Sequence, residues 1–464
     1  MDVFDEVEEM IKKRTKPFFL WKLEFDKVFD EGGFDIVIAN PPYIQLQNNG
    51  GKLANELESQ GFKTFSRMGD IYCLFYEQAI NLLKKNGTFA FITSNKWMRA
   101  GYGEKLRGFL AEYTNPRLLL DFGGTKIFES ATVDVNILIA SNSKNNHYTK
   151  TVNFADNGTE NLSVYIEQNF SYAFFSNSDN WVILNKIEQS IKDKINKKGV
   201  ALKNWDLNIY RGVLTGYNEA FIIDGSIAET FINSNYKNAD IIRPIIRGRD
   251  IDRYQYIQPN LFMICTFPSK KYNINDYPEV RDYLLSFGIE KLEQSGKTYF
   301  IDGKTVKARK KTNNKWFETQ DSINYSEEFF KQKIVYPCIM TSGPAFALDN
   351  NKNFLPAPGN IITGNNLKYL LGLLCSKIYY FALRKYYMGG GIEGELKTNR
   401  LLLLPVPPYE NNEHAKNIES LVNCINANNI EQISAEIEYE IKLMLNLNDE
   451  EYNFIINKKY LIFH

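Results

Sequence analysis

The feature that most constrains this chain is an apolar run that ends in two consecutive prolines. Residues 34–39 read Phe-Asp-Ile-Val-Ile-Ala, and Asn40, Pro41, Pro42 and Tyr43 follow directly. The run is typical of a buried strand, and the prolines fix φ and cannot donate to a sheet. Ligands of open α/β sheets bind beyond the carboxyl ends of strands, so this turn is the first candidate site.

The residue types of the turn suit one kind of substrate group. The amino nitrogen of adenine is a poor nucleophile, because its lone pair is delocalised into the ring. The side-chain oxygen of Asn40 and the carbonyl of Pro41 can accept from that amino group and draw it toward tetrahedral geometry. Tyr43 offers a flat face on which an extruded base can stack. The alternative is a rigid Pro-Pro turn with a packed tyrosine.

Further blocks accompany the turn, in residues 16–22, 69–76, 87–97 and 122–134. With their order and spacing, residues 16–140 resemble the catalytic domain of gamma-class adenine-N6 DNA methyltransferases, in the form found in type IIG restriction–modification enzymes. The resemblance implies S-adenosylmethionine as cofactor, flipping of the target base, and catalytic roles for Asn40, Pro41, Pro42 and Tyr43. It also implies that Phe128 stacks on the base opposite Tyr43, with packing under a loop as the alternative. Asp70 and Tyr72 are implied as pocket residues.

One part of that family's pattern is not found. The family carries a Gly-rich cofactor loop on an earlier strand, whereas the first glycine here is Gly32. We therefore expect an incomplete methyltransferase, inactive as this chain alone. The partner would be a chain carrying the missing N-terminal methyltransferase and nuclease segments. A permuted methyltransferase, with residues 118–125 as a strand and cofactor loop, is the alternative; such a loop should open a helix, yet residues 133–139 read as another strand.

Composition excludes several other classes of protein. The chain has 464 residues, 44% of them hydrophobic, which is enough for two or three domains. Its amino terminus is of mixed charge and no apolar run is long enough to span a membrane, so we expect a cytoplasmic protein. Five isolated cysteines and three histidines form no metal-ligand spacing, so we predict no metal site.

The second half of the chain resembles a different domain. Residues 177–408 resemble the TaqI-like target-recognition domain that follows the catalytic domain in these enzymes. A shift toward Asn, Ser, Lys and Gly precedes it. We therefore expect a catalytic part at 1–145, a linker at 146–176, the recognition domain at 177–408 and a helical segment at 409–464.

The net charge is zero, so double-stranded DNA as a partner must show in the distribution of charge. The clearest cluster is free of acidic residues and is expected to contact phosphates; its members are Lys304, Lys307, Arg309, Lys310, Lys311 and Lys315. Arg211, beside a predicted tight turn, and Lys397, after a run of glycines, are further DNA-binding candidates. The alternatives are a solvated lysine loop for the cluster, a plain hairpin for Arg211, and a helix C-cap followed by a linker for the region of Lys397.

The pattern of elements completes the expected fold. Residues 71–83 predict a helix capped by residues 84–87, residues 88–93 a buried strand, and residues 103–113 a second helix. We predict an α/β fold, in which an incomplete Rossmann-like methyltransferase sheet precedes a mixed α/β target-recognition domain. The predicted function is sequence-specific adenine-N6 methylation of DNA. The alternative is a non-catalytic DNA-binding specificity subunit that acts with a partner chain.

Overall fold

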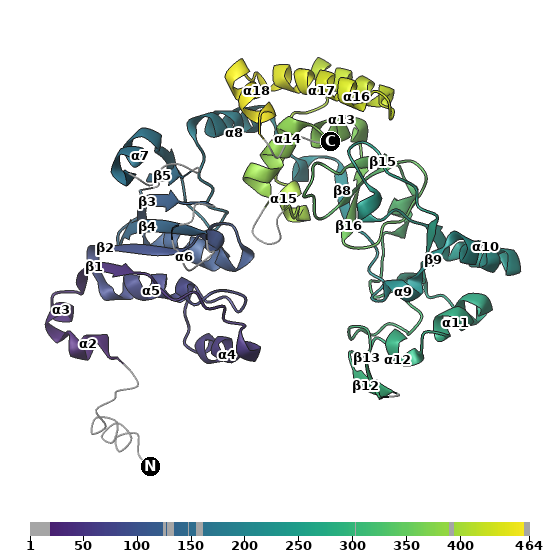
Figure 1. Cartoon of the computed structure of the whole chain (residues 1–464), viewed down its shortest axis with the longest axis horizontal. Coiled ribbons are helices and arrows are strands. Elements are labelled where there is room, and N and C mark those ends of the chain that lie inside the picture. Colours follow the sequence, from purple (N-terminus) through teal and green to yellow (C-terminus); the bar gives the residue numbers. More distant parts are fainter. Residues whose placement is uncertain are drawn as a thin grey trace, which may run out of the picture. The chain divides into compact units, whose positions relative to one another are not determined.

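The computed structural model describes residues 19–123, 127, 134–146, 148–154, 161–301, 303–388 and 394–458. They fall into two compact units, Met1–Gln189 and Ser190–His464 (Figure 1). The first unit is built on a six-stranded sheet in the order β1-β2-β4-β3-β5-β6. These strands are β1 (Phe34–Ala39), β2 (Leu83–Ser94), β3 (Asn115–Asp121), β4 (Val135–Ser141), β5 (Thr149–Asn153) and β6 (Ser171–Ala173).

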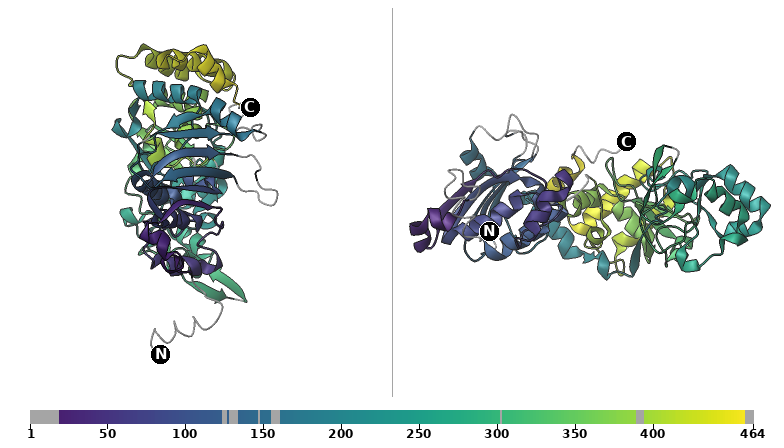
Figure 2. Two further views of the ribbon diagram at one scale, coloured as in Figure 1. Left: turned by 90° about the vertical axis from the view of Figure 1, so that its left-hand side faces the viewer. Right: turned by 90° about the horizontal axis from the view of Figure 1, so that it is seen from below.

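The strand directions bring four carboxyl ends to one edge of this sheet. β1 is parallel to β2, β4 is antiparallel to both β2 and β3, and β3 is parallel to β5. β1, β2, β3 and β5 therefore run the same way (Figures 1 and 2). The predicted α/β fold class is confirmed, with a sheet of mixed direction. The helices of this unit are α2 (Trp21–Glu24), α3 (Asp26–Asp30), α4 (Lys52–Glu58), α5 (Tyr72–Leu82), α6 (Glu104–Tyr113) and α7 (Leu162–Asn169).

Large aromatic side chains fill the core of the first unit. Trp97 and Trp181 are buried there with ring centroids 5.3 Å apart, and Tyr76 packs on Phe89 and Phe91. α5 confirms the predicted helix but ends at Leu82, and residues 84–87 belong to β2 rather than to a helix cap. The reason is pairing, because Leu83 lies opposite Phe34 of β1 and the chain enters the sheet directly after α5.

The boundary between the units differs from the expected linker. β5, α7 and β6 lie within residues 146–176, where composition indicates a linker. β5 pairs with β3, and β6 pairs with β5, so this stretch forms one side of the first sheet. Its Asn-rich and Ser-rich composition reflects short strands at a sheet edge. The helix α8 (Lys186–Lys198) then spans the division between the units.

The second unit combines small sheets with helices. A four-stranded sheet has the order β15-β14-β16-β8, a three-stranded sheet the order β10-β11-β9, and β12 and β13 form a two-stranded ribbon. A further pair joins β7 (Val200–Ala201) to β17 (Pro405–Val406). The other strands are β8 (Leu207–Arg211), β9 (Ile222–Asp224), β10 (Ile242–Pro244), β11 (Leu261–Ile264), β12 (Thr298–Ile301), β13 (Lys304–Lys307), β14 (Lys333–Pro337), β15 (Ala347–Asp349) and β16 (Gly359–Gly364).

Helices complete this unit, and the expected C-terminal helical segment is present as three of them. α16 and α17 pack on α13, and none of the helices in the described ranges is long and apolar enough to cross a membrane. The helices are α9 (Asn218–Phe221), α10 (Gly225–Ser234), α11 (Pro278–Leu285), α12 (Ile289–Leu292), α13 (Leu367–Leu374), α14 (Lys377–Ala382), α15 (Thr398–Leu401), α16 (Glu413–Cys424), α17 (Ile430–Leu445) and α18 (Asp449–Ile456).

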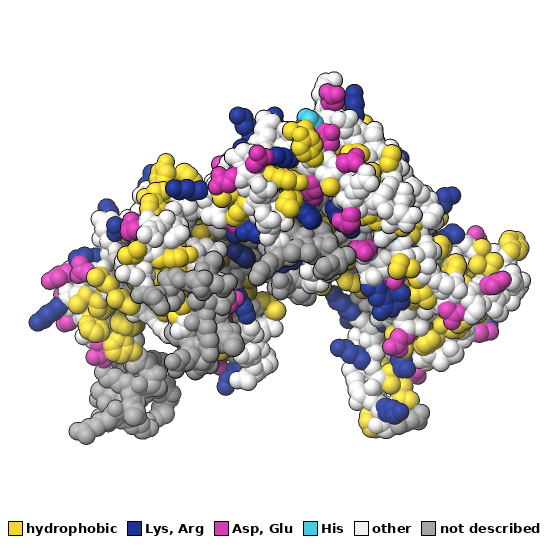
Figure 3. All heavy atoms as spheres, turned by 45° about the horizontal axis from the view of Figure 1, so that its top comes forward, with side chains coloured by type: hydrophobic (Ala, Val, Ile, Leu, Met, Phe, Trp, Pro, Cys, Tyr) yellow, Lys and Arg dark blue, Asp and Glu magenta, His cyan; other side chains and the backbone are white. Residues whose placement is uncertain are grey.

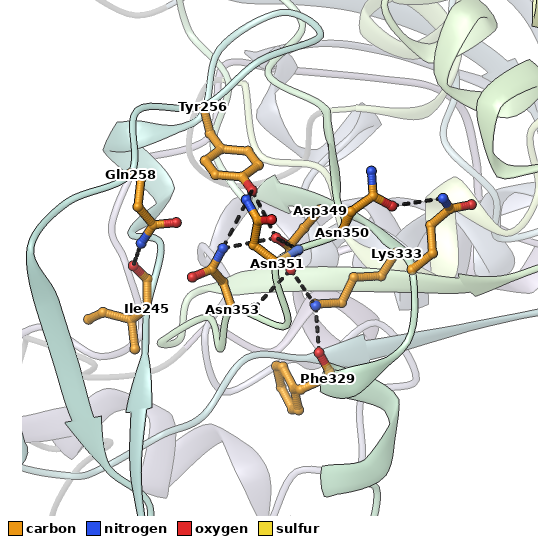
Figure 4. A network of polar contacts seen from close by, with 10 residues as sticks. Ile245, Tyr256, Gln258, Phe329, Lys333, Asp349, Asn350, Asn351 and Asn353 are labelled. Atoms are coloured by element: carbon orange, nitrogen blue, oxygen red, sulfur yellow. Dashed lines mark hydrogen bonds and ion pairs between the residues drawn. The ribbon is translucent and has the colours of Figure 1, made fainter. Parts of the chain in front are cut away.

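A buried polar network fixes loops to the four-stranded sheet (Figure 4). Lys333 of β14 donates to Asp349 of β15 at 2.5 Å and to the carbonyl of Phe329 at 2.6 Å. The same carboxylate accepts from the Tyr256 hydroxyl at 2.9 Å and from the Asn353 side chain at 2.9 Å. Because both charges are fully buried and hydrogen-bonded, this pair sets the path of the chain after β15.

Candidate base-holding site and DNA interface

The predicted strand end lies where the sequence places it. The last residue of β1, Ala39, is in register with Phe91 of β2, and the chain leaves the sheet at Asn40. Asn40 is exposed, whereas Pro41 behind it is buried and Tyr43 packs half-buried on the core. The Asn40 amide is thus presented at the carboxyl edge of the sheet on a rigid, packed turn.

Tyr43 orients the Asn40 amide. Its hydroxyl lies 3.2 Å from Asn40 Oδ1 and 3.5 Å from the carbonyl oxygen of Ile92 in β2. Burial, and then the charge of Asp70, raise the pKa of the Tyr43 hydroxyl, so it stays a proton donor. An amide oxygen has two lone pairs, so one remains for an incoming N–H group.

Asp70 ties a second segment to the turn. Its carboxylate accepts from the backbone N–H of Ile44 at 2.8 Å, and Gln45 forms a bridge with Asp70. Burial raises the pKa of Asp70, against the opposing effect of backbone N–H groups from Ile44, Tyr72 and Ile71. This predicted pocket residue therefore holds the chain where it leaves the turn, through the N–H of Ile44.

Tyr72 supports the Tyr43 ring from the interior. The two rings meet edge to face, with centroids 5.9 Å apart and planes at 81°. Tyr72 is fully buried and its hydroxyl lies 2.8 Å from that of Tyr102. Burial raises its pKa far above the ordinary range. Tyr72 therefore acts on the site through Tyr43, since its own ring does not face solvent.

Polar residues at the neighbouring strand ends were not singled out by the sequence reasoning. Asn95, just after β2, donates to Asp121 at the end of β3 at 2.8 Å, and Asp121 also accepts from the N–H of Gly123 at 3.0 Å. Asn136 in β4 donates to the carbonyl of Ser94 at 3.1 Å. Its Oδ1 is buried without a hydrogen-bond partner among the described residues. The signal was available, since Ser94 and Asn95 follow a predicted strand as Asn40 does.

Phe128, which was expected to stack on the base opposite Tyr43, lies outside the described residues. The strand pairing argues against the permuted methyltransferase, because β3 and β4 are antiparallel neighbours and need no crossover helix between them. A cofactor loop should open a helix between parallel strands.

The predicted DNA-binding residues of the second unit are largely exposed. Lys304 and Lys307 lie on β13, and exposed lysines follow it at positions 310, 311 and 315. Arg211 is exposed at the end of β8, and Lys397 is exposed with its ammonium 3.8 Å from a Glu395 carboxylate oxygen. These positions are compatible with contacts to a charged backbone.

Arg309 was predicted to contact phosphate with these lysines, and that prediction is wrong. It is 4% exposed, and its guanidinium donates to the carbonyls of Leu292, Thr215 and Glu318 at 2.8 Å each and of Trp316 at 2.5 Å. Burial lowers its pKa to about 10. Arg309 is therefore an internal anchor, because four main-chain oxygens surround it and no phosphate can reach it.

Comparisons with known proteins agree with the two halves of this architecture. Residues 2–128 match the Eco57I restriction-modification methylase family, and residues 243–406 match the TaqI-like C-terminal specificity domain. The type II restriction enzyme and methyltransferase RM.Eco57I of Escherichia coli is 25% identical over 72% of this chain and 36% of its own length. The type II methyltransferase M.BstVI of Geobacillus stearothermophilus is 22% identical over 86% of this chain and 72% of its own.

A solved structure shows the same fold. MmeI, described as a type IIL restriction-modification enzyme in complex with DNA, aligns with a TM-score of 0.52 and 13% identity. The alignment covers 92% of this chain and 56% of that chain. The present chain thus spans 36% of RM.Eco57I and little more than half of MmeI.

By sequence, residues 2–128 are similar to the Eco57I restriction-modification methylases, and residues 243–406 are similar to the TaqI-like C-terminal specificity domain. The curated relatives of the chain are type II restriction–modification methyltransferases.

Proposed function

We propose that this chain recognises a DNA sequence and holds an adenine for N6 methylation in a type IIG restriction–modification system. The observation that carries the proposal is the exposed Asn40 amide at the end of β1, held by the Tyr43 hydroxyl at 3.2 Å. The two family matches and the type II relatives support the same class of function.

The residues of the turn would act on the base itself. A flipped adenine donates its two amino hydrogens to Asn40 Oδ1 and to the Pro41 carbonyl, which favours a tetrahedral nitrogen with a localised lone pair. Tyr43, with Phe128 as its proposed counterpart, stacks on the ring. S-adenosylmethionine supplies the methyl group when it is bound. The nitrogen would form one N–C bond as the S–CH3 bond of the donor breaks, and it would release one proton to solvent, so no covalent bond between the protein and DNA is needed.

The same proposal includes a second polypeptide segment that supplies the main cofactor loop. Its support is the outer side of β1, because among the described strands of the first sheet β1 pairs with β2 alone. Ile36 is 62% exposed and Ile38 is 77% exposed, on one face of that strand. Proteins usually protect such edges, and an apolar edge strand indicates a missing neighbour. The same edge favours the second candidate, a DNA-binding specificity subunit that has no catalysis of its own.

Substitution of the Asn40 amide tests the catalytic role. In a preparation that methylates DNA, Asn40→Ala should abolish methyl transfer and leave DNA affinity nearly unchanged, because the amide acts on the amino group and not on the duplex. Transfer of labelled methyl groups and DNA binding are measured side by side. Asn48→Ala, at an exposed asparagine of the following loop, is the matched control. Methylation by Asn40→Ala at a near-normal rate would reject the proposed catalytic role.

A further inference from the structure

The β12–β13 ribbon presents one free face. β12 and β13 are paired only with each other among the described strands, and the hairpin projects from the second unit (Figure 1). Phe300 lies opposite Thr305, and Thr298 lies opposite Lys307. Side chains alternate across a strand, so these four share a face. All four are exposed, and Phe300 is 78% exposed. We call this the outer face.

The opposite face is held against the unit. Tyr299, Ile301 and Val306 are partly buried. The Tyr299 hydroxyl donates to the Glu293 carboxylate at 2.7 Å. These contacts fix the orientation of the ribbon, so the outer face stays exposed. The two faces are not equivalent, because the reverse face is partly buried.

Arg309 anchors the base of the ribbon. The ladder continues below β12 and β13, since Ala308 donates to the carbonyl of Lys297 at 2.9 Å and Gly296 donates to that of Arg309 at 2.9 Å. The Arg309 guanidinium binds four carbonyls and lies 5.1 Å from the centre of the Phe221 ring. A hairpin mounted in this way can position side chains precisely enough to discriminate between base pairs.

The chemistry of the ribbon fits a nucleic-acid groove. The outer face offers one aromatic ring, two hydroxyls and one ammonium group. Exposed lysines flank it at positions 297, 304, 310 and 311, and Figure 3 shows Lys and Arg side chains on this part of the second unit. Hydroxyls exchange hydrogen bonds with base edges, an aromatic ring contacts the thymine methyl group, and ammonium groups contact phosphates.

We propose that the outer face of the β12–β13 ribbon enters the major groove of duplex DNA and reads base pairs through Phe300 and Thr305. The inference rests on the proposed function of the second unit in DNA recognition. Two strands about 4.8 Å apart, with side chains, fill a groove about 12 Å wide and are too broad for one of about 6 Å. The flanking lysines hold the ribbon in register on the phosphates.

Selection from a pool of DNA tests the assignment. The whole chain is incubated with duplexes that carry a randomised centre, and bound DNA is sequenced to give the preferred motif. Phe300→Ala combined with Thr305→Val should lose the preference at one to three adjacent positions, where discrimination of roughly 5- to 150-fold per base pair is expected in the wild type. Thr305→Val keeps the β-branched shape, so the ribbon should still form. Tyr236→Ala removes an equally exposed aromatic, 80% exposed, elsewhere in the unit and should leave the motif intact.

The outcomes separate the two proposals. A variant that selects the full wild-type motif, with or without loss of overall affinity, would overturn base reading by the ribbon while leaving DNA recognition by the chain intact. A wild-type chain that selects no motif would overturn the proposed DNA recognition and this inference with it. Circular dichroism melting of both variants shows whether the fold is retained.

Discussion

At the scale of single residues, Tyr43 serves the proposed site in two separable ways. Its ring offers a stacking face, and its hydroxyl holds Asn40 Oδ1. Tyr43→Phe keeps the ring, so in a methylating preparation the rate should fall only about two- to tenfold, the worth of one hydrogen bond of about 0.5–1.5 kcal/mol. Tyr43→Ala should in addition weaken binding of the flipped base by roughly 1–3 kcal/mol, because the stacking face is lost. Kinetics of methyl transfer and fluorescence of a 2-aminopurine target measure the two effects; equal rates for both variants would argue against stacking.

The residue scale also shows what the sequence could reveal. The order of residue types placed Asn40 and Tyr43 at a strand end, because prolines and an apolar run are local signals. Arg309 was grouped with the lysines around it, because burial by the carbonyls of Leu292 and Thr215 depends on distant parts of the chain. The same limit applies to Tyr72, whose contact with Tyr102 is made only after folding.

At the scale of elements, the lysines at the end of the ribbon and just after it should contact the phosphates of DNA. Replacing Lys307, Lys310 and Lys311 together by alanine should weaken binding to all duplexes alike and flatten the salt dependence by about 0.9 in slope per lost contact. Arg309→Lys is the matched variant: it keeps the charge but loses at least one buried hydrogen bond, so unfolding should become easier by about 1.5–3 kcal/mol. Fluorescence anisotropy at several salt concentrations and thermal melting measure these effects. An unchanged slope in the triple variant would identify the lysines as an ordinary solvated loop.

Helices with strong periodicity, such as α5 and α6, were predicted from the sequence. The residues at which the elements end were predicted less accurately. Lysines followed by Asn-Gly after α5 resemble a helix cap, yet pairing between Phe34 and Leu83 recruits them into β2. The strands β5 and β6 carry few apolar residues, so composition indicated a linker there; β5 is held by pairing with β3, and β6 by pairing with β5. Local patterns thus predict the elements, and long-range pairing decides where they end.

The edge element β1 gives a prediction of its own. Ile36→Lys with Ile38→Lys should leave the melting temperature of this chain nearly unchanged, because both side chains are exposed. The variant should self-associate less and bind less of a hydrophobic dye, because charge on an edge strand opposes strand addition. Light scattering and dye fluorescence are the measurements, with Val164→Lys, another exposed apolar position, as control. A large drop in Tm would show that these side chains already support the fold.

At the scale of the whole molecule, we propose that different segments bind the target base and the cofactor. In the first unit Asn40 and Asp121 lie at strand ends, whereas Asp70 precedes α5, and each accepts a hydrogen bond through its side chain. Of the three, the exposed Asn40 amide suits a base amino group. The contacts to the methionine and ribose of the cofactor are assigned by the family resemblance to a segment before the turn. Recognition of DNA, in contrast, is proposed for the second unit, which contains the matched specificity region.

Binding of S-adenosylmethionine by this chain alone is therefore expected to be weak or absent. Isothermal titration of the isolated chain with the cofactor measures it directly, because a bound site would release heat with defined stoichiometry. Titration of the same preparation with duplex DNA serves as the control for a folded, competent second unit. Retained DNA binding without cofactor binding is the expected result. Tight binding of one cofactor per chain would contradict the proposed division and revive the permuted arrangement, in which the chain after β3 forms the cofactor loop.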